Sequence, residues 1–83
     1  MFTVYILKTD KDTLYIGQTK DLKARLRKHR VGKGAKYFRI FKSFELVYTE
    51  KFKTLSEALR REHQLKKLSK QEKENLITTS LKT

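Results

Sequence analysis

Two short segments rich in β-branched and aromatic residues lie close together at the start of the chain. They cover residues 2–8 (FTVYILK) and 14–18 (LYIGQ), and the polar residues 9–13 separate them. This composition favours strands, and a short polar connection between two strands is typical of a hairpin. The chain therefore begins with an antiparallel pair of strands, on which the later elements must pack.

The register of this hairpin follows from four apolar residues that must share one buried face: Val4, Ile6, Leu14 and Ile16. Slipping the pairing by one residue would expose one of the two sets. Because side chains alternate between the faces of a strand, Tyr5, Tyr15 and Gly17 then lie together on the opposite face. The pattern predicts a surface that carries two tyrosines and a bare backbone.

The middle of the chain is predicted to form a helix and a third strand. Asp21 can cap a helix that runs to about residue 30, and Gly32 and Gly34 end it. Residues 44–50 (FELVYTE) resemble a strand with apolar side chains on both faces, which is typical of a central strand.

Two capping boxes, Thr54 with Glu57 and Ser69 with Glu72, open the last helices. The first helix extends over residues 54–68, and the second is short and passes through Leu76 and Ile77. The predicted fold is α/β (α+β), a small three-stranded antiparallel sheet flanked by helices in the order ββαβαα. Residues 1–77 form a single domain, and residues 78–83 form a C-terminal tail.

The size and the lack of cysteine limit what this domain can be. The 83 residues support one modest core, and the absence of Cys excludes disulfides, thiolate zinc sites and thiol nucleophiles. No apolar run approaches the roughly 20 residues of a membrane span. We therefore expect a cytoplasmic protein that is held together by packing alone and has no membrane partner.

The charge balance indicates a polyanionic partner. The formal net charge is +12, and the segment from Lys20 to Lys42 holds one acid and ten bases. The bases are Lys20, Lys23, Arg25, Arg27, Lys28, Arg30, Lys33, Lys36, Arg39 and Lys42. For a single lysine, a solvated surface position is the simpler interpretation, but the segment as a whole favours phosphate binding.

Glu62 is out of place on its predicted helix. A helical wheel at about 100° per residue puts Leu55, Ala58, Leu59 and Leu65 on one arc with Glu62 at its centre. A carboxylate taken from water must be paired, hydrogen-bonded, metal-bound or protonated. A buried ion pair with an arginine and a site for Mg²⁺ both stay open.

Arg25 and His29 are one turn apart on the first helix. The same projection places both beside Leu22 and Leu26, so they point toward the sheet. A guanidinium aimed at the tyrosine face is well shaped for a bidentate phosphate contact. For His29 alone, a packed and hydrogen-bonded residue is the ordinary interpretation.

Together these groups match the needs of phosphodiester hydrolysis. Water needs a base, the phosphorane needs positive charge, and the leaving oxyanion needs a metal. A tyrosine serves as the base when surrounding cations lower its pKa. The chain has no HExxH, P-loop or serine nucleophile elbow.

Four motifs in order carry a family resemblance. They are Val4-Tyr5-Ile6, Leu14-Tyr15-Ile16-Gly17, LKARLRKH with Arg25, and SEALRREHQLKKLSK with Glu62, and GKGAKY lies between the last two. Over residues 2–77 the chain resembles the GIY-YIG nuclease superfamily, most closely its small single-domain bacterial members described as predicted endonucleases. Thr3 stands where the first motif glycine is expected.

The resemblance implies a role for each motif residue. Tyr5 and Tyr15 are the two motif tyrosines, one of which is thought to deprotonate the attacking water, and Arg25 stabilises the scissile phosphate. His29 falls where several members have a supporting histidine. Glu62 looks like the single acidic ligand of the metal, Mg²⁺ or Mn²⁺. Many members also use a late asparagine, for which Asn75 is the nearby candidate.

The function expected from these features is metal-dependent hydrolysis of DNA, with preference for a structure such as a branch or nick over a base sequence. Gly17, Lys33, Lys36 and Arg39 would contact the nucleic acid, and Tyr37 would stack on an unpaired base or else join the core. A separate protein partner for target choice fits a chain with no second domain. The alternatives are a non-catalytic nucleic-acid-binding module and, ranked last, an RNA-associated basic protein.

Overall fold

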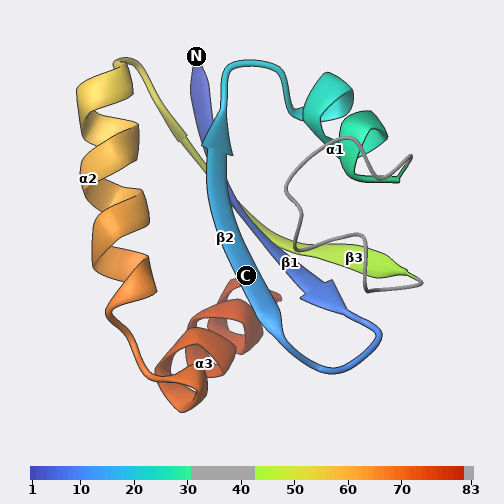
Figure 1. The fold of residues 1–83 in the computed structure, drawn as a ribbon. Coiled ribbons are helices and arrows are strands. Elements are labelled where there is room, and N and C mark those ends of the chain that lie inside the picture. Colours follow the sequence, from blue (N-terminus) through green and yellow to red (C-terminus); the bar gives the residue numbers. More distant parts are fainter. Residues whose placement is uncertain (31–42, 82–83) are drawn as a thin grey trace.

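The computed structural model describes residues 1–30 and 43–81, and Figure 1 shows how their elements are arranged. The elements are β1 (Phe2–Thr9), β2 (Leu14–Thr19), α1 (Leu22–Arg30), β3 (Phe44–Phe52), α2 (Leu55–Lys66) and α3 (Lys70–Leu81). The order is ββαβαα and the three strands pair antiparallel, so the predicted fold class is confirmed. No helix in this part of the chain is long and apolar enough to cross a membrane.

The sheet has the order β2-β1-β3, which places β1 in the centre. The prediction that the third strand is central was wrong, because β3 lies at an edge of the described sheet and pairs there with β1. The apolar pattern of β3 has a different cause. Ile6 pairs with Tyr48 and Leu7 with Leu46, so Val47 is the extra residue of a β-bulge. Val47 and Tyr48 can then pack against the same core, while Leu46 is 39% exposed.

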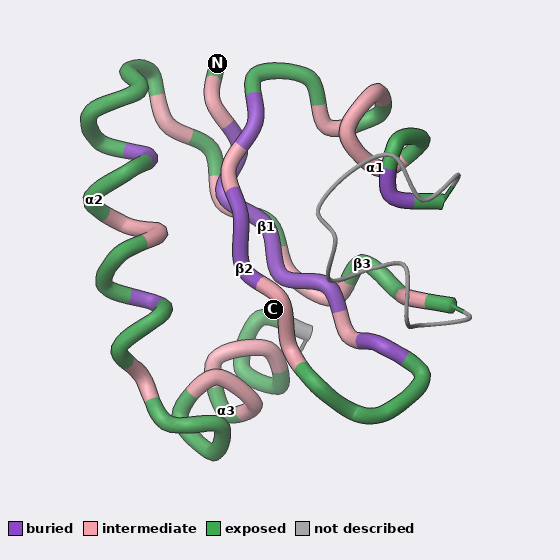
Figure 2. The backbone as a smooth tube through the Cα atoms, in the orientation of Figure 1, coloured by how far each residue is buried: buried purple, intermediate pink, exposed green. Residues whose placement is uncertain are grey.

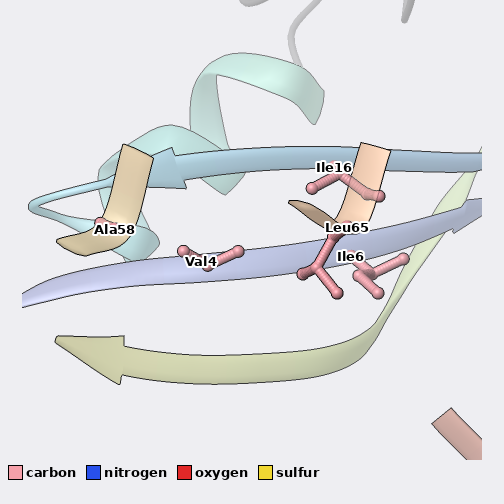
Figure 3. Close-up of a cluster of buried hydrophobic side chains, with 5 residues drawn as sticks. All are labelled: Val4, Ile6, Ile16, Ala58 and Leu65. Atoms are coloured by element: carbon pink, nitrogen blue, oxygen red, sulfur yellow. The ribbon is translucent and has the colours of Figure 1, made fainter. Parts of the chain in front are cut away.

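Helices cover both faces of the sheet (Figure 1). Under α2 and α3 lies the main core, formed by Val4, Ile6, Ile16, Ala58 and Leu65 (Figure 3). On the other face, Tyr5 and Leu7 are buried against Leu22 and Leu26 of α1. Figure 2 shows that burial runs along the central strand and touches α2 only where that helix faces the sheet. The predicted hairpin faces are therefore confirmed.

The helix starts follow the predicted caps. Asp21 Oδ1 accepts from the Ala24 N–H at 3.1 Å. At the start of α2, Thr54 and Glu57 form a complete capping box. Ser69 and Glu72 form the second box, with distances of 2.9 and 3.1 Å.

The last helix is longer than predicted. It was expected to end near Ile77, but α3 continues to Leu81 and so includes the first part of the predicted tail. Residues 78–81 (TTSL) contain neither Gly nor Pro, so nothing in them stops a helix that the capping box has started. The domain boundary at residue 77 stays a prediction.

Candidate active site at the free edge of β2

The Tyr5 side chain extends from the central strand, β1, over the edge strand, β2. Tyr5 pairs with Gly17 of β2, and its side chain is 1% exposed. A Cβ added at Gly17 would lie 2.6 Å from the Tyr5 hydroxyl oxygen and 2.8 Å from its Cζ, closer than any real contact allows. The glycine is therefore required so that the Tyr5 hydroxyl can lie over β2.

Tyr15 and His29 complete an aromatic cluster around that hydroxyl. The ring centroids of Tyr5 and Tyr15 are 6.4 Å apart, and the His29 ring meets Tyr15 edge-on at 5.6 Å. His29 comes from the last turn of α1 and also meets the Phe44 ring edge-on at 6.1 Å. Tyr15 is only half-buried, so this tyrosine forms the accessible side of the cluster.

Tyr5 and His29 are joined by a hydrogen bond of 3.2 Å between the phenol oxygen and Nε2. His29 is 2% exposed, and burial, with a smaller contribution from the Arg25 charge, lowers its pKa below the usual 6.5. The imidazole is therefore neutral at pH 7, and in the tautomer that carries its proton on Nδ1, Nε2 accepts from the Tyr5 hydroxyl.

The pKa of Tyr5 moves in the direction opposite to the one a tyrosine base was expected to need. Burial raises the pKa most, the neighbouring Tyr15 raises it further, Arg25 lowers it, and Glu62 raises it slightly. The phenol is thus protonated across the neutral range. The expected lowering of a tyrosine pKa by surrounding cations is wrong for Tyr5, because desolvation outweighs the charge of Arg25.

Arg25 lies within electrostatic range of both buried groups. Its charge acts on the pKa of Tyr5 and on the pKa of His29, and its side chain is half-buried on α1. The helix therefore turns Arg25 toward the sheet as the wheel predicted. This position directs a permanent positive charge at the tyrosine cluster.

Glu62 reaches the same region from the other helix layer. On α2, Arg61 bonds to Glu50 of β3 at 3.2 Å, which identifies the flank of the helix that faces β3. Consecutive residues of a helix point about 100° apart, so Glu62 lies on the other side of the buried stripe from Arg61. Glu62 therefore faces β2. Its effect on the pKa of Tyr5 agrees with this placement.

The Glu62 carboxylate is neutralised by no arginine in the part of the chain that the structure describes. The Glu62 carboxylate pairs with the Lys66 ammonium, one turn later, at 2.9 Å, and the Glu62 side chain is 19% exposed. The buried arginine pair that the sequence left open is therefore not observed here. A hard oxygen donor of this kind, held at a half-buried position by a solvent-exposed lysine, fits a divalent cation.

The arc on which Glu62 was predicted to be central is only half buried. Ala58 and Leu65 are fully buried, whereas Leu55 and Leu59 are 43% and 46% exposed. The sheet is only three strands wide, so α2 covers it with a narrow stripe. Glu62 therefore lies at the margin of the core rather than in its middle.

Comparison with known proteins decides the family. The family model described as the GIY-YIG catalytic domain matches residues 1–75. This chain belongs to the GIY-YIG family. The UPF0213 protein of Staphylococcus epidermidis is 49% identical over 74 residues, which are 89% of this chain and 90% of that protein.

Two solution NMR structures resemble the fold. The UPF0213 protein of Bacillus halodurans has a TM-score of 0.62 and 42% identity, and a protein from E. faecalis has a TM-score of 0.64 and 38% identity. In both cases the match covers 95% of this chain and 85% of the other. GIY-YIG domains are nuclease domains, which implies hydrolase activity and a nucleic-acid substrate. Nucleases of this family generally use a divalent metal.

The GIY-YIG motifs thus lie on two neighbouring strands, with Tyr5 on the central strand and Tyr15 and Gly17 on the edge strand. Four predicted contact residues, Lys33, Lys36, Tyr37 and Arg39, lie outside the described residues. Asn75 is exposed on α3, where its Oδ1 accepts from Gln71 at 3.0 Å.

One residue of this region was missed from the sequence. Gln18 follows Leu14 and Ile16 at every second position of β2, which is the face that α2 covers. A polar side chain at a core position of an alternating strand is the signal that identifies it.

Proposed function

We propose that this protein is a divalent-metal-dependent endonuclease that hydrolyses phosphodiester bonds in DNA. The observation that carries the proposal is the state of Glu62. Its carboxylate lies at the β2 side of α2, within electrostatic range of Tyr5, and pairs with Lys66 rather than with an arginine among residues 1–30 and 43–81. An acidic ligand, a tyrosine pair and an arginine, which come from four different elements, then face one edge of the sheet.

The proton of the attacking water is handled by the tyrosines and His29. With the His29 proton on Nδ1, the Tyr5 hydroxyl donates to Nε2, so it can accept a proton from water while its own proton passes to Nε2. This relay needs no tyrosinate and is compatible with the raised pKa of Tyr5. Tyr15, which is half-buried beside it, orients the water.

Arg25 and Glu62 act on the phosphate. The Arg25 guanidinium offers paired donors to the phosphate oxygens, whose charge grows as the water attacks. Glu62 would hold Mg²⁺ or Mn²⁺, and the bound cation supplies Lewis-acid stabilisation of the leaving oxygen.

The substrate is DNA recognised by its shape, such as a branch or a nick. The basic segment from Lys20 to Lys42 supplies phosphate contacts, and phosphate contacts carry no sequence information. Lys33, Lys36 and Arg39 are proposed for this role, with Gly17 beside the backbone and Tyr37 as a stacking platform. Target choice beyond shape would come from a protein partner.

The test is cleavage of plasmid and branched DNA in the presence of Mg²⁺ or Mn²⁺. We expect metal-dependent nicking by the parent, loss of nicking in Glu62→Gln, and a fall of about 10²- to 10³-fold in Arg25→Ala. Matched controls are Glu74→Gln on α3 and Arg60→Ala, an exposed arginine of α2, and both should cleave like the parent. Salt-sensitive binding without cleavage by the parent would instead establish the non-catalytic module.

A further inference from the structure

Gln18 holds a buried oxygen that no group in residues 1–30 and 43–81 satisfies. Its side-chain carbonyl oxygen Oε1 is inaccessible to solvent and accepts no hydrogen bond from these residues. Buried polar atoms in folded proteins almost always have a partner, so this acceptor needs one from outside the described residues, such as a water or a cation.

The position of Gln18 along the sheet is set by its pairing. Gln18 lies opposite Val4, and both side chains point to the face covered by α2. Figure 3 shows Val4 between the levels of Ala58 and Leu65 of α2. Gln18 is therefore beneath the middle of α2, on the outer strand.

Glu62 lies in the middle of α2, at the level of the helix under which Gln18 is placed. It is four residues after Ala58 and three before Leu65, and it faces β2 because Arg61, on the opposite flank, bonds to Glu50 of β3. Gln18 from the strand and Glu62 from the helix thus lie on the β2 side of the layer between α2 and the sheet, at a similar level along the helix.

The two side chains offer the oxygen donors that hard divalent cations select. Amide carbonyl and carboxylate oxygens are ordinary ligands of Mg²⁺ and Mn²⁺, and the exposed Lys66 ammonium would leave Glu62 when the cation binds. We propose that Gln18 Oε1 is a second protein ligand of the cation held by Glu62. This inference rests on the proposed function.

The experiment is a titration of the ¹⁵N-labelled protein with Mn²⁺ alone, followed by NMR. Paramagnetic broadening should reach the Gln18 side-chain amide and the Glu62 backbone amide at the same Mn²⁺ concentration. Gln18→Met, which keeps the size and removes the carbonyl, should weaken Mn²⁺ binding about tenfold, and Gln18→Glu should strengthen it. Gln71→Met, which removes an exposed amide on α3, is the matched control and should bind like the parent.

Each result bears on a different claim. Broadening around Glu62 with unchanged affinity in Gln18→Met overturns the role of Gln18 and leaves the Glu62 cation site standing. Absence of broadening around Glu62 in the parent overturns both this inference and the metal site of the proposed function. If Gln18→Met loses its native spectrum, Gln18→Glu decides, and an affinity no higher than that of the parent overturns the inference.

Discussion

At the scale of single residues, the site depends on two groups whose burial keeps them uncharged. His29 is neutral because burial and Arg25 lower its pKa, and Tyr5 is neutral because burial raises its pKa. The hydrogen bond between them uses both neutral forms. Protonation of His29 would remove the acceptor of this bond and place a second positive charge beside Arg25.

Acid should therefore destabilise the protein in a window set by His29. The unfolded chain takes up a proton near pH 6.5, whereas the folded chain does so only at lower pH. Between these two values the unfolded state binds more protons, so the free energy of unfolding falls as the pH falls. Urea denaturation between pH 7.5 and 5.5 measures this slope. His29→Gln should flatten it, whereas His63→Gln, at an exposed histidine of α2, should keep it.

At the scale of the elements, the sequence predicts local features well and long-range strand pairing poorly. Strand alternation and capping boxes are local, so the tyrosine face of the hairpin and the starts at Thr54 and Ser69 could be predicted. Which strand is central depends on pairing between residues far apart in the sequence. The bulge in β3 puts apolar residues at successive positions, which is also the pattern of a central strand.

The same distinction applies to the candidate site. The wheel identified Glu62 as unusual, but the narrow sheet leaves Leu55 and Leu59 exposed, which periodicity alone does not reveal. The direction in which the pKa of Tyr5 shifts could not be predicted from the sequence either. It depends on how deeply the phenol is buried and on how far it lies from the Arg25 charge. The role of Gln18 depends on the burial of its side-chain oxygen, which has no donor in the described part of the chain, and burial of one atom cannot be read from the sequence.

The capping box of α2 should matter for both stability and the cation site, because it determines where the helix that carries Glu62 begins. Thr54 accepts from the Glu57 N–H at 3.2 Å, and Glu57 accepts from the Thr54 N–H at 3.2 Å. Thr54→Ala should lower the free energy of unfolding by about 1 kcal/mol. Urea denaturation checks this value. Ser56→Ala, which removes an exposed hydroxyl inside the same first turn, should cost much less.

At the scale of the whole molecule, charge is distributed unevenly. The tip of the hairpin is held by a cluster in which Asp12 bridges Lys8 at 3.0 Å and Lys70 at 3.1 Å. This cluster ties the loop between β1 and β2 to the start of α3. Basic residues instead dominate the segment from Lys20 to Lys42 and produce most of the net charge of +12.

DNA binding should accordingly weaken steeply with salt. If Arg25, Lys33, Lys36 and Arg39 each contact a phosphate, raising the salt from about 50 to 200 mM should reduce affinity about a hundredfold. Fluorescence anisotropy with the Glu62→Gln variant measures this without cleavage. Lys36→Gln should reduce the slope of log affinity against log salt by about one, whereas Lys70→Gln should leave it unchanged. Equal slopes in both variants would remove Lys36 from the interface.

The central place of β1 has a consequence for how the site can move. Tyr5 belongs to β1, the strand that has neighbours on both sides. The backbone amide protons of β1 should therefore exchange with solvent only when the whole sheet opens. Tyr15 and Gly17 belong to a strand with one neighbour, where smaller openings suffice. Half of the aromatic cluster is thus anchored as firmly as the fold itself, and under the proposed function any adjustment to the nucleic acid must come from the other half.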